Sequence, residues 1–138
     1  MATVFGVNFG NGDSVVGGTE VGARNVISGN NGHGVMIGIS GGFWIEGNVI
    51  GTRANGTSPL PNTGDGINIA ALTTSNSTLL NNIIAFNGGR GINAISGFDC
   101  NVLANSIFSN ASLGIDVNGD GLTPNDTGDA DKRRTFRC

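Results

Sequence analysis

Asn81-Asn82-Ile83-Ile84-Ala85-Phe86-Asn87 is the stretch that decides the fold, because the chain repeats it at a fixed distance. The same phrase returns 23 residues later as Ala104-Asn105-Ser106-Ile107-Phe108-Ser109-Asn110. Two earlier copies begin around Asn25 and Asn48, which are also 23 residues apart. The interval from Asn48 to Asn82 is 34 residues, the same period with an 11-residue insertion. A constant period of this size is typical of a repeat architecture.

A second phrase, glycine followed by alternating apolar and polar residues, occurs once in each period. It begins at Gly6, Gly34, Gly66, Gly91 and Gly114. The alternation predicts a half-buried β-strand. The Asn-x-Ile phrase and the apolar residues before it predict two further short strands, with Gly, Asn and Ser at the turns. No segment of the sequence has the i, i+3, i+4 apolar spacing of an amphipathic helix.

Three short strands in each 23-residue period predict an all-β fold, a short right-handed parallel β-helix (solenoid) of about four to five rungs. Equivalent side chains then stack along the axis as ladders. Three apolar ladders are expected inside: Ile27, Ile50, Ile84 and Ile107; Val35, Ile67, Ile92 and Ile115; and Ile45, Leu79 and Val102. A structural corner ladder is expected from amides that bond along the stack and to the turn backbone, formed by Asn25, Asn48, Asn82 and Asn105.

Composition and charge define the domain and narrow its partners. We expect one repeat domain over residues 1–131, with an insertion at 53–63, and a basic C-terminal tail at 132–138. All ten acidic residues and only three arginines precede the tail, so no basic stripe follows the repeats and no nucleic-acid partner is expected. No run of 18 apolar residues occurs and the start lacks the pattern of a secretory signal, so no membrane partner is expected. Cys100 and Cys138 are expected as thiols rather than as a disulfide.

The repeats also resemble a known group. Several segments are similar to bacterial right-handed parallel β-helix repeat proteins of the pectate-lyase-like solenoid superfamily. They are Gly22-Ala23-Arg24-Asn25-Val26-Ile27-Ser28-Gly29-Asn30, residues 32–35, 47–52 and 62–67, and the closing residues 113–126. The resemblance covers roughly residues 14–131. It implies an exported or surface protein with a carbohydrate role, although the sequence shows no signal peptide and leaves the localisation open.

Function is expected where the rungs differ. The residues before the strand glycines are His33, Asp65 and Arg90 on successive rungs, which predicts that they stack as outward neighbours. A His–carboxylate–Arg row can bind or process an anionic sugar, and these three residues are the catalytic candidates. The other interpretation is a charge-compensated surface stack. Gly32-His33-Gly34 also echoes polygalacturonase-like hydrolases, but their accompanying Asp-Asp pair and Arg-Ile-Lys phrase are absent.

An acidic segment near the end predicts a calcium site. Asp116-Val117-Asn118-Gly119-Asp120-Gly121 fits the opening of a D-x-N-x-D-G loop, in which alternate oxygen ligands suit Ca²⁺. The candidate ligands are Asp116, Asn118, Asp120 and Asp126. The twelfth loop position is Thr127 instead of the bidentate Glu, so an ordinary exposed loop is the alternative.

Trp44 is the candidate carbohydrate-binding residue. It is expected to point outward because Ile45 faces the core, and an exposed indole can stack on a sugar ring. Sugar-binding surfaces usually present more than one aromatic side chain, which favours a second interpretation. In that interpretation Trp44 covers a face beneath the insertion and packs against Pro59-Leu60-Pro61.

Together these features favour a non-enzymatic β-solenoid scaffold or binding module that presents a surface to a polysaccharide or a protein. We expect it to self-associate as a homo-oligomer through open solenoid ends or a flat β face, with no cofactor other than Ca²⁺. The alternative is a fragment of a carbohydrate-active enzyme, a polysaccharide lyase or a glycoside hydrolase. A third possibility is a remnant of a larger surface protein.

Overall fold

The computed structural model describes residues 5–9, 13–38, 41–70, 76–94, 100–117, 119 and 121. These residues form short β-strands and no helix, so they contain no helix that could cross a membrane. The strands are β1 (Val7–Phe9), β2 (Ser14–Gly17), β3 (Val26–Ile27), β4 (Val35–Ile37), β5 (Phe43–Glu46), β6 (Val49–Ile50), β7 (Ile67–Ile69), β8 (Ser77–Leu80), β9 (Ile83–Ala85), β10 (Ile92–Ala94), β11 (Cys100–Leu103), β12 (Ser106–Phe108) and β13 (Ile115–Val117).

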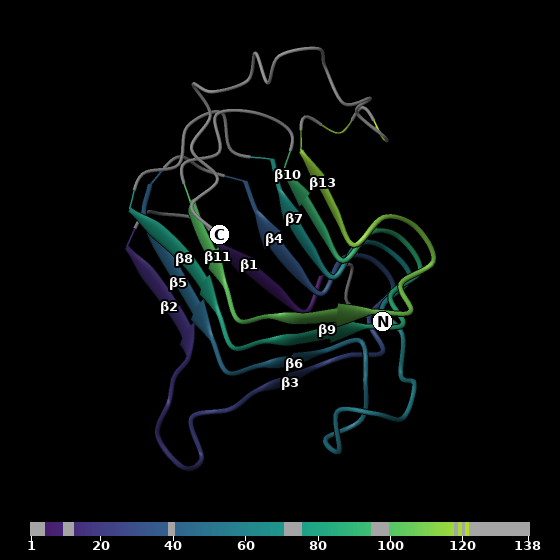
Figure 1. The fold of residues 1–138 in the computed structure, drawn as a ribbon, viewed down its shortest axis with the longest axis horizontal. Helices are drawn as coiled ribbons and strands as arrows, with labels where there is room; N and C mark the ends of the chain where they lie inside the picture. The colour runs from purple at the N-terminus through teal and green to yellow at the C-terminus, as the bar shows by residue number, and fades with distance from the viewer. Residues whose placement is uncertain are drawn as a thin grey trace.

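The strands stack into three parallel sheets, which are the three sides of a solenoid (Figure 1). Sheet A has the order β1-β4-β7-β10-β13, sheet B β11-β8-β5-β2 and sheet C β12-β9-β6-β3. Each turn adds one strand to each sheet, so the chain completes about four turns before β13. The path rises along sheet A, descends along sheet B and returns along sheet C while it advances toward the viewer of Figure 1, which makes the solenoid right-handed. The expected fold class is confirmed.

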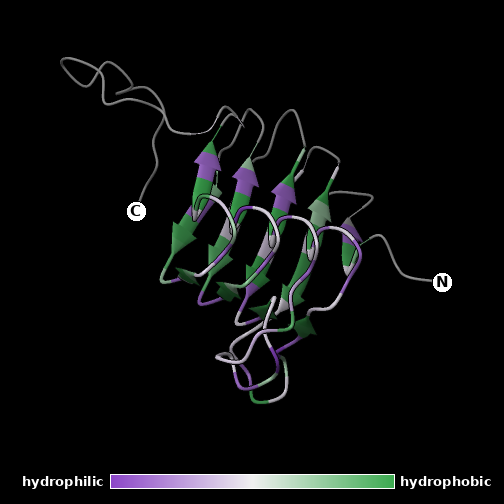
Figure 2. Ribbon diagram, turned by 90° about the vertical axis from the view of Figure 1, so that its right-hand side faces the viewer, coloured by the Kyte–Doolittle hydropathy of each residue, from purple (hydrophilic) through white to green (hydrophobic). Residues whose placement is uncertain are grey.

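The three expected apolar ladders line the interior in the expected register, although Ile115, on the last strand, is 43% exposed. Ile27, Ile50, Ile84 and Ile107 are aligned in sheet C; Val35, Ile67, Ile92 and Ile115 in sheet A; and Ile45, Leu79 and Val102 in sheet B. Ile45, Ile67 and Leu79 have no exposed surface. The strands in Figure 2 carry most of the hydrophobic colour and the connecting turns most of the polar colour. Burial of these ladders is the main stabilising term.

The corner between sheets B and C carries the asparagine ladder. The Nδ2 groups of Asn25, Asn48 and Asn82 donate to the Oδ1 of the next asparagine along the axis at 3.0, 3.2 and 2.9 Å. Each of these Oδ1 atoms also accepts the backbone N–H of the preceding asparagine. The amide of Asn82 donates in addition to the carbonyl of Ile45 at 2.8 Å. The ladder therefore pairs backbone groups that the corner leaves without a partner in the sheets.

A second asparagine ladder, which the sequence reasoning did not identify, lies at the corner between sheets C and A. It consists of Asn30, Asn62, Asn87 and Asn110, joined by Nδ2–Oδ1 hydrogen bonds of 2.8, 2.8 and 2.9 Å. The glycines that precede the sheet A strands lie against this ladder. A Cβ on Gly34 would be 2.7 Å from the carbonyl oxygen of Gly66 and 2.9 Å from Nδ2 of Asn62. No side chain fits there, which explains the regular Gly-[Ile/Val] phrase.

The insertion ends at residue 61, two residues earlier than expected. Asn62 already belongs to the second ladder, and the N–H of Thr63 donates to the carbonyl of Asn30 at 3.0 Å. The two remaining extra residues lie between β7 and β8, because Ile69 to Ser77 spans eight positions and Ala94 to Cys100 spans six. A bridge between Thr52 and Pro59 closes the insertion.

Candidate functional site

Asp65 is the centre of a polar cluster beside sheet A. Its side chain is buried, and its two oxygens accept three hydrogen bonds: from the Arg90 backbone N–H at 2.7 Å, from Asn68 Nδ2 at 3.0 Å and from Asn93 Nδ2 at 3.3 Å. Asn68 and Asn93 are neighbours in register on the outer side of β7 and β10. The carboxylate therefore joins two strands and the turn before β10.

His33 lies next to Asp65, as the ladder alignment predicts. Its Nδ1 accepts the backbone N–H of Asp65 at 3.0 Å and is 3.4 Å from Asp65 Oδ2. A ring nitrogen that accepts a hydrogen bond carries no proton, so this geometry corresponds to the neutral tautomer protonated at Nε2. In this form the 3.4 Å contact is not an ion pair. The other neighbour of the imidazole is Phe5, stacked at 6.0 Å between ring centroids with an interplanar angle of 2°.

Arg90 does not complete an outward row of catalytic groups. Its guanidinium Nε pairs with Oδ2 of Asp116 and not with the Asp65 carboxylate, which it contacts only through its backbone N–H. The side chain of Asp116 has no exposed surface, so the guanidinium compensates a buried charge. The three residues are neighbours along the stack, but Asp65 is only 5% exposed, whereas the side chains of His33 and Arg90 are 27% and 30% exposed. Their catalytic role stays a prediction.

The geometry at Asp65 predicts a structural effect of its substitution. In Asp65→Asn one acceptor oxygen becomes an NH₂ group that faces a donor whichever way the amide turns. We expect the free energy of unfolding to fall by about 2–3 kcal/mol. Urea titration followed by circular dichroism measures this. Asp13→Asn is the matched control, because Asp13 is exposed and its substitution should change stability by about 0.5 kcal/mol or less. Equal losses in the two variants would contradict the assignment.

The predicted calcium ligands are described only in part. Asp116 lies buried at the middle of β13, where its Oδ1 accepts the N–H of Gly121 at 3.3 Å and its Oδ2 contacts Arg90. Asn118, Asp120 and Asp126 lie outside the described residues. Among the residues that the structure describes, no group of three or more His, Cys, Asp or Glu side chains is arranged to hold a metal ion. The calcium site stays a prediction.

Trp44 points away from the core, as expected, and is 42% exposed. Its indole N–H donates to Oε2 of Glu46 at 2.8 Å, the next outward side chain on β5. The alternative position beneath the insertion is wrong. The insertion lies against sheet C, where a Cβ on Gly56 would be 2.8 Å from Ile83 and Leu60 is next to Gly29. Figure 1 shows the insertion and β5 on different sides of the solenoid.

A pocket of about 400 Å³ lies between the extended turn after β2 and the corner after β5. Glu46, which accepts the hydrogen bond from Trp44, is one of its lining residues. The polar lining of the pocket comes from Thr19, Glu20 and Arg24 on the turn, Glu46 on β5 and Asn81 on the third rung, with glycines between them. Sequence reasoning missed this pocket. The available signal was that the first rung has six more residues than the second between the sheet B strand and the sheet C strand, since Val16 to Ile27 spans eleven positions and Ile45 to Ile50 spans five.

No family model, no curated protein and no solved structure matches this chain. The structure itself shows a parallel β-solenoid of about four turns.

Proposed function

We propose that the chain is a non-enzymatic β-solenoid binding module and that it presents the outer face of sheet B to a polysaccharide. The observation that carries the proposal is Trp44, whose indole is exposed on a flat parallel sheet and held at its N–H edge by Glu46. Val15, paired in register with Trp44 and 69% exposed, extends the apolar surface to the next strand, about 4.8 Å away. An oriented aromatic ring beside an apolar neighbour suits the apolar face of a sugar ring.

The sequence resemblance supports the same reading. We propose on that ground a relationship to bacterial, pectate-lyase-like solenoids that are exported or exposed at the cell surface. The resemblance rests on the repeat phrases around Asn25 and Asn48 and on the residues after Asn62, which in this structure form ladders and turns.

Removal of the indole tests the proposal. Calorimetric titration with β-1,4-linked hexamers of glucose, glucosamine and glucuronic acid would measure affinity. We expect Trp44→Ala to weaken the hexamer that binds best by about tenfold, or about 1.4 kcal/mol, because the stacked apolar area is lost. Trp44→Phe is expected to retain most of the affinity. Binding that is unchanged in Trp44→Ala, or absent from the native protein for all three hexamers, would refute the proposal.

A fragment of a carbohydrate-active enzyme is the second candidate. The observation that favours it is that two carboxylates, Glu20 and Glu46, line one pocket next to Trp44, since glycoside hydrolases use a carboxylate pair as acid and base. Asp65, the carboxylate expected from the sequence, instead accepts hydrogen bonds from the backbone of the turn and from two asparagines. Release of reducing ends or unsaturated uronates by the native protein, lost in Glu46→Gln, would favour the enzyme.

We also propose self-association through the solenoid ends. In the part of the chain that the structure describes, the first strands (β1, β2, β3) and the last strands (β13, β11, β12) of the three sheets each have one paired neighbour. Strand edges of this kind pair readily with another chain. Light scattering is expected to give a mass above that of one 13.9 kDa chain, and a monomeric mass at every concentration would contradict this proposal.

A further inference from the structure

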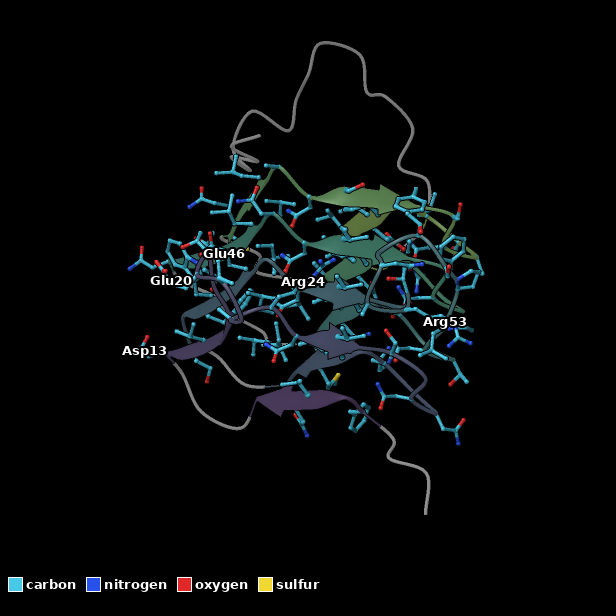
Figure 3. The ribbon with its side chains drawn as sticks, turned by 90° about the horizontal axis from the view of Figure 1, so that it is seen from below. Asp13, Glu20, Arg24, Glu46 and Arg53 are labelled. Carbon is cyan, nitrogen blue, oxygen red and sulfur yellow. The ribbon has the colours of Figure 1, made fainter. Side chains whose placement is uncertain are left out.

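The charges around the pocket are segregated. Asp13 and Glu20 lie with Glu46 on the sheet B side of the molecule, whereas Arg53 lies on the side of the insertion (Figure 3). Arg24 lies between them, and its Nη2 atom is 3.5 Å from the position that a Cβ on Gly56 would take, so its charge is directed toward the insertion. The side of the pocket on which Glu20 and Glu46 lie is therefore acidic.

Glu46 is placed to receive a ligand. Only 8% of the residue is exposed, and its Oε2 is occupied by the indole N–H of Trp44. Within the described residues its other carboxylate oxygen has no hydrogen-bond partner. An ionised carboxylate only accepts hydrogen bonds. A group that satisfies the open oxygen must therefore be a donor, a hydroxyl or an ammonium.

We propose that this pocket is a specificity subsite that takes a sugar unit through hydroxyl or ammonium donors and rejects uronates. The inference rests on the proposed function, because the adjoining sugar stacks on Trp44, two positions from Glu46 on the same side of β5. A uronate in the pocket would bring its carboxylate against Glu20 and Glu46, and juxtaposed like charges are strongly unfavourable where water is displaced. An amino sugar that turns its C2 ammonium toward Glu46 instead gains a charge-assisted hydrogen bond.

The three hexamers used for Trp44 share one β-1,4 linkage and differ in charge. Glucosamine carries an ammonium in place of the C2 hydroxyl of glucose, and glucuronate carries a carboxylate in place of the C6 hydroxymethyl group. At about pH 6 and 0.15 M salt we expect the glucosamine hexamer to bind most tightly and the glucuronate hexamer at least tenfold more weakly than the glucose hexamer. Glu20→Gln and Glu46→Gln keep the side-chain shape and remove the charge. Each is expected to reduce the ratio of glucosamine to glucuronate affinity by about tenfold. Asp13 is an acid on the same side of the molecule that does not line the pocket. Asp13→Asn should change the ratio of glucosamine to glucuronate affinity by no more than about twofold, because salt screens the charge of Asp13 from the bound sugar.

The outcomes separate the inference from the proposed function. If binding depends on Trp44 but the affinity ratio is the same in the native protein and in both glutamine variants, the subsite inference is wrong and the binding surface stands. Tight binding of the glucuronate hexamer by the native protein overturns the inference in the same way. If no hexamer binds, or Trp44→Ala has no effect, both are overturned.

Discussion

Replacing Asn82 with alanine is expected to lower the free energy of unfolding by about 3–5 kcal/mol, a large share of the roughly 5–15 kcal/mol that stabilises a domain of this size. Asn82 is 1% exposed, and its side chain takes part in four hydrogen bonds. Alanine would leave the backbone N–H of Asn48 and the carbonyl of Ile45 buried without these partners. Each unsatisfied buried group costs about 1–3 kcal/mol.

The first asparagine of the same ladder supplies the control. Asn25 is exposed, and its side chain donates a single bond, to Oδ1 of Asn48 at 3.0 Å. Asn25→Ala is expected to cost about 1 kcal/mol or less, because Oδ1 of Asn48, which loses this bond, still accepts the backbone N–H of residue 25. Urea unfolding followed by the fluorescence of Trp44, the one tryptophan of the chain, measures both variants. If Asn82→Ala does not fold, Asn105→Ala, which is partly exposed, should give an intermediate loss. Similar losses of unfolding free energy in the Asn25 and Asn82 variants would show that the ladder hydrogen bonds do not stabilise the corner.

Gly51→Ala is expected to lower the free energy of unfolding by about 2–5 kcal/mol. Gly51 has a φ of +87°, and a Cβ there would meet the carbonyl oxygen of Ala85 and would be 2.6 Å from Oδ1 of Asn87. The backbone cannot move away freely, because the Gly51 N–H donates to the carbonyl of Ile27 and its carbonyl accepts from Leu60. The left-handed conformation costs about 1–2 kcal/mol and overpacking about 1–3 kcal/mol.

Gly22→Ala separates these two contributions. Gly22 has a similar φ of +92°, but nothing lies within 4 Å of its Cβ position. Its substitution should show the conformational cost alone, about 1–2 kcal/mol. Thermal and urea unfolding of the two variants would be compared directly. Equal destabilisation would mean that the close approach of Gly51 to the next rung has no energetic consequence.

Most of the solenoid was predictable from the sequence, because ladders form only where equivalent residues recur at a constant spacing. Strands that stack in parallel need rungs of equal length, so the 23-residue interval from Asn82 to Asn105 predicts both the register and the inward residues. The second ladder was missed for the same reason. Asn30, Asn87 and Asn110 each follow a ladder asparagine by five positions, but the insertion moves the corresponding residue of the second rung to Asn62.

The candidate site was less predictable because its contacts join positions that are not equivalent in the repeat. Alignment of rungs places Arg90 next to Asp65, but the guanidinium pairs with Asp116, one rung further on and on the strand instead of the turn. The long arginine side chain can reach several acceptors. It pairs with Asp116 because a buried carboxylate without a cation beside it would be strongly destabilising.

What the sequence by itself determined is the solenoid: its all-β character, its rungs, the apolar ladders and the asparagine corner around Asn82. These follow from periodicity and alternation, which are properties of the linear chain. Only the tertiary structure decided that the turn at residues 18–24 meets Glu46 and Asn81 to form the pocket, and that the insertion covers sheet C and leaves Trp44 exposed. Turns of irregular length have no period to restrict their path, so their contacts depend on which surfaces the stacked rungs bring within reach.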